Sequence, residues 1–174
     1  LVSANERFRS NDVPYPYRQN NNFYYVTGFD EPNAILVVHK TDKNKLIEHF
    51  FIKKPNAHDE VWTGKLPSKQ YVKKTYDFTK VDYVDDLQKY LTEYLARSNV
   101  VYHSLDKDSD IIESFEKSIE IIKKKYRSGA IAPAKNICLD SVIQDHRLIK
   151  DKYEINAIKK SATVSSKVHL NLME

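Results

Sequence analysis

The first third of the chain alternates short apolar runs with polar turn residues. A polar, Asn-rich stretch leads into an aromatic and β-branched run, and a Gly and a Pro separate this run from a continuous apolar one. A third, mostly apolar run follows. Apolar runs of about four to eight residues between turn residues are typical of strands. The pattern predicts three strands joined as a meander, at about residues 23–28, 34–40 and 45–52.

In the middle of the chain, apolar residues recur with the period of a helix. One apolar stripe predicts an amphipathic helix that carries Val84, Leu87, Leu91 and Leu95. Asp82 stands where its N-cap is expected, and Asp85 falls in its first turn. A second stripe predicts another amphipathic helix that carries Ile112, Phe115, Ile119 and Ile122. Either Asp108 or Ser109 is expected to open this second helix, which closes near Gly129.

The segments around these two helices complete an α/β pattern. Asn99–His103 lies between them and predicts another buried strand, so that strands and helices alternate. Helix-breaking residues predict a loop over residues 128–138. A final helix is predicted from about Asp151, because Asp151 and Glu154 stand at capping-box spacing. This helix runs to the last residue without a C-cap signal and is therefore expected to be interrupted there.

Composition and charge exclude several classes of protein. With 41% hydrophobic and 30% charged residues, the chain of 174 residues falls in the globular class. No apolar run approaches the roughly 20 residues that span a bilayer, so no membrane span is expected. The net charge of +4 is spread over interleaved acids and bases, with one dense basic run, Lys123–Lys125, at a predicted helix end. Nucleic acid is therefore not an expected partner.

Few residues in the sequence point to catalysis. The six histidines include no pair at the spacing of a helical zinc motif, and His58, Asp59 and Glu60 stand together in an expected surface loop. Three glycines cannot supply the usual nucleotide-binding or nucleophile-elbow motifs. Cys138, the single cysteine, lies between two apolar residues, so we expect it to be a buried small hydrophobe. A single cysteine also excludes an intrachain disulfide.

Trp62 has an unusual setting. It is the only tryptophan and lies in a polar stretch, Asp59–Gly64, which is expected to be a loop. Two interpretations stay open at this point. Trp62 either folds back over the sheet, since tryptophans are well buried on average, or it is exposed and contacts a ligand or another subunit.

Six short patterns in order run through nearly the whole chain. They are Arg9–Asp12 with Tyr15–Asn20, Phe23–Phe29 with Glu31-Pro32, Glu60–Gly64, Val100–His103, Ala132-Pro133-Ala134, and Arg147–Lys150 with Glu154-Ile155. Together they resemble the N-terminal domain of aminopeptidase P, in the creatinase/prolidase superfamily. The resemblance implies a creatinase-like α/β domain, a mixed sheet flanked by helices, over residues 1–150. Residues 151–174 would then begin a truncated C-terminal domain of the pita-bread type.

The resemblance implies that the chain is a non-catalytic oligomerisation and substrate-access domain. Enzymes of this kind are metalloaminopeptidases that remove the N-terminal residue from peptides, of the Xaa-Pro type or of a mitochondrial presequence-processing type. Their catalytic domain holds two divalent metal ions, usually manganese, and the ligands of these ions are not expected in this chain. The implied partners are peptide or protein N-termini and further copies of the protein. By itself the chain is not expected to hydrolyse peptides.

The resemblance also implies roles for two residues. Trp62 matches a loop tryptophan that reaches the catalytic cleft of a neighbouring subunit. Arg127 matches an arginine that binds substrate from a neighbouring subunit, with an ordinary solvated cation at a helix end as an equal alternative. No catalytic residue and no metal ligand are expected in the chain.

A second class of function stays open from the sequence. A histone-chaperone subunit carries a peptidase-like domain of the same superfamily without catalysis, so a protein-binding module is the alternative. The segments around Arg18-Gln19 and Trp62 favour the peptidase. The expected compartment is the mitochondrion or the cytoplasm, with any transit peptide outside the given sequence.

Overall fold

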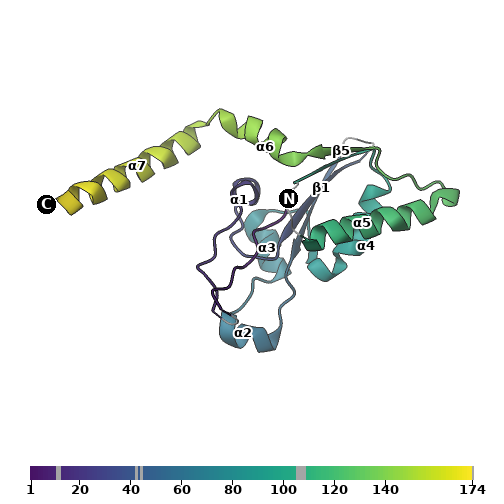
Figure 1. The fold of residues 1–174 in the computed structure, drawn as a ribbon, viewed down its shortest axis with the longest axis horizontal. Coiled ribbons are helices and arrows are strands. Elements are labelled where there is room, and N and C mark those ends of the chain that lie inside the picture. The colour runs from purple at the N-terminus through teal and green to yellow at the C-terminus, as the bar shows by residue number, and fades with distance from the viewer. Residues whose placement is uncertain (11–12, 42, 44, 105–108, 174) are drawn as a thin grey trace. The chain divides into compact units, whose positions relative to one another are not determined.

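The chain is described by a computed structural model over residues 1–10, 13–41, 43, 45–104 and 109–173. It divides into two compact units, Leu1–Leu139 and Asp140–Glu174. The first unit carries the strands and most of the helices (Figure 1). The domain boundary expected between residues 150 and 151 falls inside the second unit and stays a prediction.

Within the described residues, the first unit has five strands in two sheets. The larger sheet has the order β1 (Ile35–Lys40), β2 (Leu46–Ile52) and β3 (Lys80–Tyr83). The smaller sheet pairs β4 (Val100–His103) with β5 (Lys135–Cys138). β1 and β2 are antiparallel, whereas β2–β3 and β4–β5 are parallel. The strands that the sequence predicts at 34–40, 45–52 and 99–103 are confirmed to within one residue at each end. The last of them was expected to be buried, which is wrong, because β4 is only half-buried.

The predicted meander is wrong, because the third strand of the larger sheet comes from later in the chain. β3 lies parallel to β2, and parallel neighbours need a long crossover. That crossover contains α2 (Ala57–Thr63) and α3 (Lys69–Tyr76), which the sequence pattern did not indicate. The two helices have seven and eight residues and β3 has four, so their periodicity is too short to stand out.

The segment predicted as the first strand, residues 23–28, is the helix α1 (Asn21–Thr27). Asn20 caps this helix by accepting hydrogen bonds from two backbone N–H groups of the first turn, at 2.9 and 3.1 Å. Gly28 ends it with φ at 66°, the left-handed conformation that glycine adopts readily. Phe23 and Thr27 are both buried four residues apart, which is the period of a helix. The caps decide the conformation here, against the strand preference of the aromatic residues.

The first predicted middle helix is confirmed as α4 (Leu87–Leu95), preceded by a 3-10 turn over Val84–Asp86. Asp85, expected in the first turn of the helix, lies in this 3-10 turn ahead of α4. The prediction that Asp82 is the N-cap is wrong, because Asp82 belongs to β3. Its carboxylate accepts hydrogen bonds from side chains of other elements instead.

The second predicted middle helix is confirmed as α5 (Ser109–Lys124). Asp108, the alternative opening residue, lies outside the described residues. α5 ends before Gly129, and a 3-10 turn over Tyr126–Ser128 joins the two. The predicted loop over 128–138 is only partly right, since its last four residues form β5 beside β4.

The second unit consists of α6 (Leu139–Leu148), whose first residue belongs to the first unit, and α7 (Lys152–Met173). The pattern did not indicate α6, whereas the capping box of α7 is confirmed. Asp151 Oδ1 accepts a hydrogen bond from the Glu154 N–H at 2.8 Å, and Glu154 Oε2 accepts one from the Asp151 N–H at 2.8 Å. The apolar stripes of α7 are exposed at Ile155, Ile158, Val164, Val168 and Leu172.

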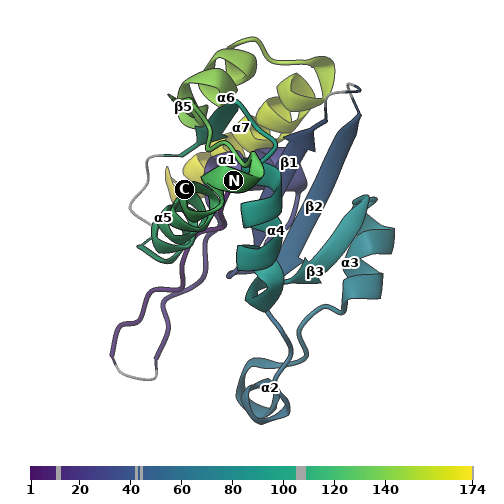
Figure 2. The same ribbon diagram turned by 90° about the vertical axis from the view of Figure 1, so that its right-hand side faces the viewer.

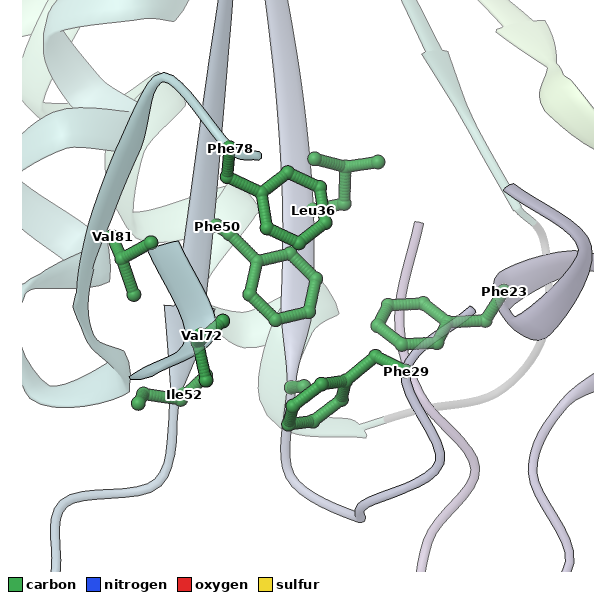
Figure 3. Close-up of a cluster of buried hydrophobic side chains, with 9 residues drawn as sticks. Phe23, Phe29, Leu36, Phe50, Ile52, Val72, Phe78 and Val81 are labelled. Carbon is green, nitrogen blue, oxygen red and sulfur yellow. The ribbon is translucent and has the colours of Figure 1, made fainter. Parts of the chain in front are cut away.

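Alternate side chains of β1 and β2 pack on the two faces of the larger sheet. On one face the Phe50 ring stacks on Phe78 at 4.2 Å between ring centroids and meets Phe29 edge-on at 5.1 Å (Figure 3). α1 adds Phe23 to this cluster, and α3 adds Val72. The opposite face buries Ile35, Phe51 and Leu87. Helices on both faces make the fold α/β, as expected.

Candidate functional site

Trp62 lies on α2 and not in a loop, so the predicted loop conformation is wrong. The Trp62 side chain is 84% exposed, and that of its neighbour Val61 is 77% exposed. Trp62 therefore does not fold back over the sheet in this structure. An apolar pair this open to solvent is available for contact with another molecule.

Local hydrogen bonds shape the residues around Trp62, which we call the Trp62 segment, residues 56–66. Asn56 caps α2 by accepting a hydrogen bond from a first-turn N–H at 3.1 Å. The Glu60 carbonyl accepts a hydrogen bond from the Gly64 N–H at 3.1 Å, and the Glu60 Oε1 accepts one from the Leu66 N–H at 3.2 Å. Gly64 has φ at 82°, a conformation that L side chains rarely adopt.

The Trp62 segment takes no part in the apolar core. Neither buried cluster of the first unit includes any of its described residues. Figures 1 and 2 show α2 beyond the end of the larger sheet, joined to it by its two connecting segments. A helix as short as α2 is marginal in water without tertiary packing. The cap and the hydrogen bonds that Glu60 accepts therefore help to stabilise its conformation.

Arg127 lies on the turn that follows α5 and is exposed. α2 and α5 lie well apart in both views of the first unit (Figures 1 and 2). The structure therefore does not bring Trp62 and Arg127 together within one chain. The substrate-binding role of each residue stays a prediction.

A buried polar group that the sequence did not predict lies between the larger sheet and α4. His49 of β2 has no exposed surface; its Nε2 lies 3.1 Å from Asp82 Oδ2 and its Nδ1 lies 2.9 Å from the Tyr94 hydroxyl. An ionised carboxylate only accepts hydrogen bonds, so Nε2 carries the proton and the Tyr94 hydroxyl donates to Nδ1. Burial and the nearby Lys80 cation lower the pKa of His49 to about 4, so the imidazole is neutral at pH 7.

Two lysines complete this arrangement, which we call the His49 network: His49, Asp82, Tyr94, Lys69 and Lys80. Lys69 Nζ lies 3.4 Å from Asp82 Oδ1, and Lys80 Nζ lies 3.7 Å from Asp82 Oδ2. Burial alone would raise the pKa of Asp82, but the hydrogen bonds from His49 and Lys69 lower it. The Asp82 carboxylate joins β2, β3 and α3, and the His49 ring adds α4 through Tyr94.

The His49 network has the chemistry of an active site but not the access. A strongly shifted pKa and a Tyr–His–Asp sequence of hydrogen bonds are common in catalytic centres. His49 is completely buried, however, so a substrate cannot reach its ring. We therefore infer that the network stabilises the fold of the first unit. The one sign of it in the sequence is a histidine placed beside the phenylalanines of a buried strand.

The described residues do not form a metal site. No group of three or more His, Cys, Asp or Glu side chains among them could hold a metal ion. His58 and Glu60, expected in a surface loop, lie on α2. Cys138, expected to be buried, is half-buried at the end of β5. Among the described helices, none is at once long and apolar enough to cross a membrane.

A family model described as "Aminopeptidase P, N-terminal domain" matches residues 1–102, more than half of the chain. The chain belongs to this family. The resemblance seen in the sequence is thereby confirmed.

Curated relatives of the chain carry peptidase names. "Xaa-Pro aminopeptidase" of Escherichia coli (strain K12) is 28% identical over 174 residues, which cover 100% of this chain and 40% of the relative. "Xaa-Pro aminopeptidase 3" of Dictyostelium discoideum is 30% identical over 171 residues, with 95% and 30% covered. "Intermediate cleaving peptidase 55" of Saccharomyces cerevisiae is 24% identical over 175 residues, with 96% and 34% covered. The chain thus spans between 30% and 40% of the length of these relatives.

Solved structures agree with this family membership. "Proline aminopeptidase P II from Yersinia pestis" superimposes with a TM-score of 0.91 at 27% identity, covering 100% of this chain and 40% of that one. A structure of aminopeptidase P from E. coli in its low-pH form has a TM-score of 0.90 at 28% identity, with 97% and 38% covered. The creatinase-like α/β fold, a mixed sheet flanked by helices, is therefore confirmed for this chain.

Proposed function

We propose that this chain is the non-catalytic N-terminal domain of a metalloaminopeptidase, where it assembles subunits and shapes access to the substrate cleft. Family membership and the names of the relatives support an enzyme that removes the N-terminal residue from peptides. The E. coli relative supports the Xaa-Pro type, and the name of the yeast relative supports a presequence-processing type. The catalytic metals, two divalent ions expected to be manganese, would be held by another part of a longer polypeptide.

The exposed Trp62 on α2 is the observation that carries this proposal. α2 stands beyond the end of the sheet, so Trp62 can enter a cleft of a neighbouring subunit without any change in its own core. There the indole would form an aromatic wall that positions the peptide without joining the chemistry. Arg127, also exposed, is the second proposed contact and would bind the substrate through its guanidinium.

The compartment is proposed as the mitochondrion or the cytoplasm. The relatives include a bacterial enzyme and eukaryotic ones, which is consistent with either. A homo-oligomer is part of the same proposal, because Trp62 acts on a neighbouring copy.

Substitution of Trp62 in the longer polypeptide tests this function. Trp62→Ala is expected to lower kcat/KM for peptide cleavage by about 10- to 100-fold, since substrate positioning is lost while the chemistry is intact. Trp62→Phe keeps an aromatic wall and is expected to retain most activity. Tyr71→Ala, which removes another exposed aromatic side chain, is the matched control and is expected to cleave normally.

Thermal melts of the same variants separate this role from core packing. The proposal predicts a melting temperature for Trp62→Ala close to that of the unaltered enzyme. A collapsed melting temperature with normal turnover per folded molecule would contradict it.

A further inference from the structure

We propose that Glu60 is the residue that fixes the position of Trp62, through the hydrogen bond from the Leu66 N–H to its carboxylate. This inference rests on the proposed role of Trp62 at a peptide-binding cleft. Glu60 is thus a positioning residue, which acts through Trp62 and does not contact the substrate itself.

The geometry of the Trp62 segment supports this assignment. Glu60 Oε1 accepts the Leu66 N–H at 3.2 Å, and the Glu60 carbonyl accepts the Gly64 N–H at 3.1 Å. Glu60 thus bonds to the chain on the C-terminal side of Trp62 at two points, through its carboxylate and through its backbone carbonyl. Positions two apart on a helix point about 200° away from each other around its axis. The Glu60 carboxylate therefore turns towards the backbone of its own segment, while the Trp62 ring points to solvent.

This hydrogen bond matters because the described residues of α2 take no part in the apolar core. None of them belongs to a buried apolar cluster. The chain leaves α2 through Gly64, which has φ at 82°. Leu66, half-buried two residues beyond that glycine, is bonded to the Glu60 side chain. Loss of the Glu60 carboxylate removes this link between α2 and the following segment, so the end of α2 that carries Trp62 is expected to become more mobile.

The single tryptophan makes Trp62 its own reporter. Time-resolved fluorescence anisotropy of the 174-residue chain measures how freely the indole moves relative to the whole molecule. Glu60→Ala is expected to raise the amplitude of the nanosecond component about twofold, because the segment becomes mobile on the timescale of loop motion. Glu60→Gln keeps the Oε1 acceptor and is expected to match the unaltered chain. Glu120→Ala removes an exposed carboxylate of α5 and is the matched control.

Amide hydrogen exchange at Leu66 measures the bond itself. The Leu66 N–H is expected to be protected in the unaltered chain. Glu60→Ala is expected to speed its exchange about tenfold, because the variant loses one hydrogen bond to a charged group. Glu60→Gln is expected to restore most of the protection. An unprotected Leu66 amide in the unaltered chain overturns the inference without any variant.

The two readouts do not involve peptide cleavage, so failures of the two proposals can be told apart. Unchanged anisotropy and exchange in Glu60→Ala, with cleavage still sensitive to Trp62→Ala, overturn the role of Glu60 alone. A mobile Trp62 in Glu60→Ala, with cleavage insensitive to Trp62→Ala, overturns the role of Trp62 at the cleft and leaves Glu60 as the residue that fixes its position. In the longer polypeptide, Glu60→Ala is expected to raise KM more than it lowers kcat, with rescue by Glu60→Gln.

Discussion

The Trp62 segment and the His49 network reverse the usual placement of apolar and polar side chains. The largest apolar side chain of the protein is 84% exposed, whereas an imidazole has no exposed surface. His49 is buried because both ring nitrogens have partners, Asp82 and Tyr94, supplied by two other elements. Trp62 is exposed because the seven residues of α2 leave the sheet altogether. Burial here follows from the position of the backbone and from available partners more than from side-chain polarity.

The two regions contribute to different properties of the protein. The His49 network joins four elements of the first unit, so its loss is expected to lower the free energy of unfolding. The described residues of the Trp62 segment belong to neither apolar cluster, so loss of Trp62 is expected to affect contacts with other molecules.

Replacement of His49 is expected to have the largest effect on stability. His49→Ala leaves the Tyr94 hydroxyl and one Asp82 oxygen without their buried partner and opens a cavity, which together cost about 3 kcal/mol in the free energy of unfolding. Trp62→Ala in the same chain is expected to cost less than about 0.5 kcal/mol, as for an exposed side chain. Chemical denaturation measures the loss of unfolding free energy in each variant. Equal losses for the two variants would contradict this difference between the two regions.

Acid is expected to have a smaller effect through the same histidine. The groups that face His49 are Asp82, Lys80, Asp86 and the hydroxyl of Tyr94. The pKa of His49 is about 4 in the folded chain, below its ordinary value of 6.5, so the unfolded chain binds more protons between these values. Stability is therefore complete above about pH 6.5, is lower by about 2 kcal/mol at pH 5 and continues to fall towards pH 4.

Unfolding measured by denaturant at several pH values between 7 and 4 tests whether stability falls as the pH is lowered. His49→Gln cannot take up the proton and is expected to flatten the dependence in that window, although the variant is less stable throughout. Asp82 adds its own loss at still lower pH, because its pKa is lowered in the folded chain. An unaltered chain whose stability is constant from pH 7 to pH 4 would count against a neutral, buried His49.

Much of the fold was predictable where the sequence carries long or well-bounded patterns. The stripes of α4 and α5, the apolar runs of β1 and β2 and the capping box of α7 were each predicted from the sequence. α1 was not, because Phe23 and its neighbours favour a strand while the cap at Asn20 and the turn at Gly28 impose a helix. α2, α3 and β3 are too short for a periodic signal, and their placement depends on the parallel pairing of β3 with β2.

The candidate site was predictable only in part. The polar setting of Trp62 indicated that it was not an ordinary core residue, but it did not show that the residue lies on a capped helix. The His49 network could not be predicted from the sequence. Asp82 and Tyr94 lie 33 and 45 residues beyond His49 and meet it only through sheet pairing and helix packing. In the sequence, Glu60 stood out only as part of an expected surface loop and of the Glu60–Gly64 pattern. Its bond to Leu66 depends on the turn at Gly64, which no spacing rule reveals.

Iodide quenching of Trp62 fluorescence in the 174-residue chain tests most directly the claim that Trp62 stands outside the core. The chain has one tryptophan, so the signal belongs to that residue alone. Quenching in the folded chain is expected to be nearly as strong as in the chain unfolded by denaturant, with emission close to that of indole in water. Strong protection from iodide, together with a blue-shifted emission, would place Trp62 against the core and contradict its exposed position on α2.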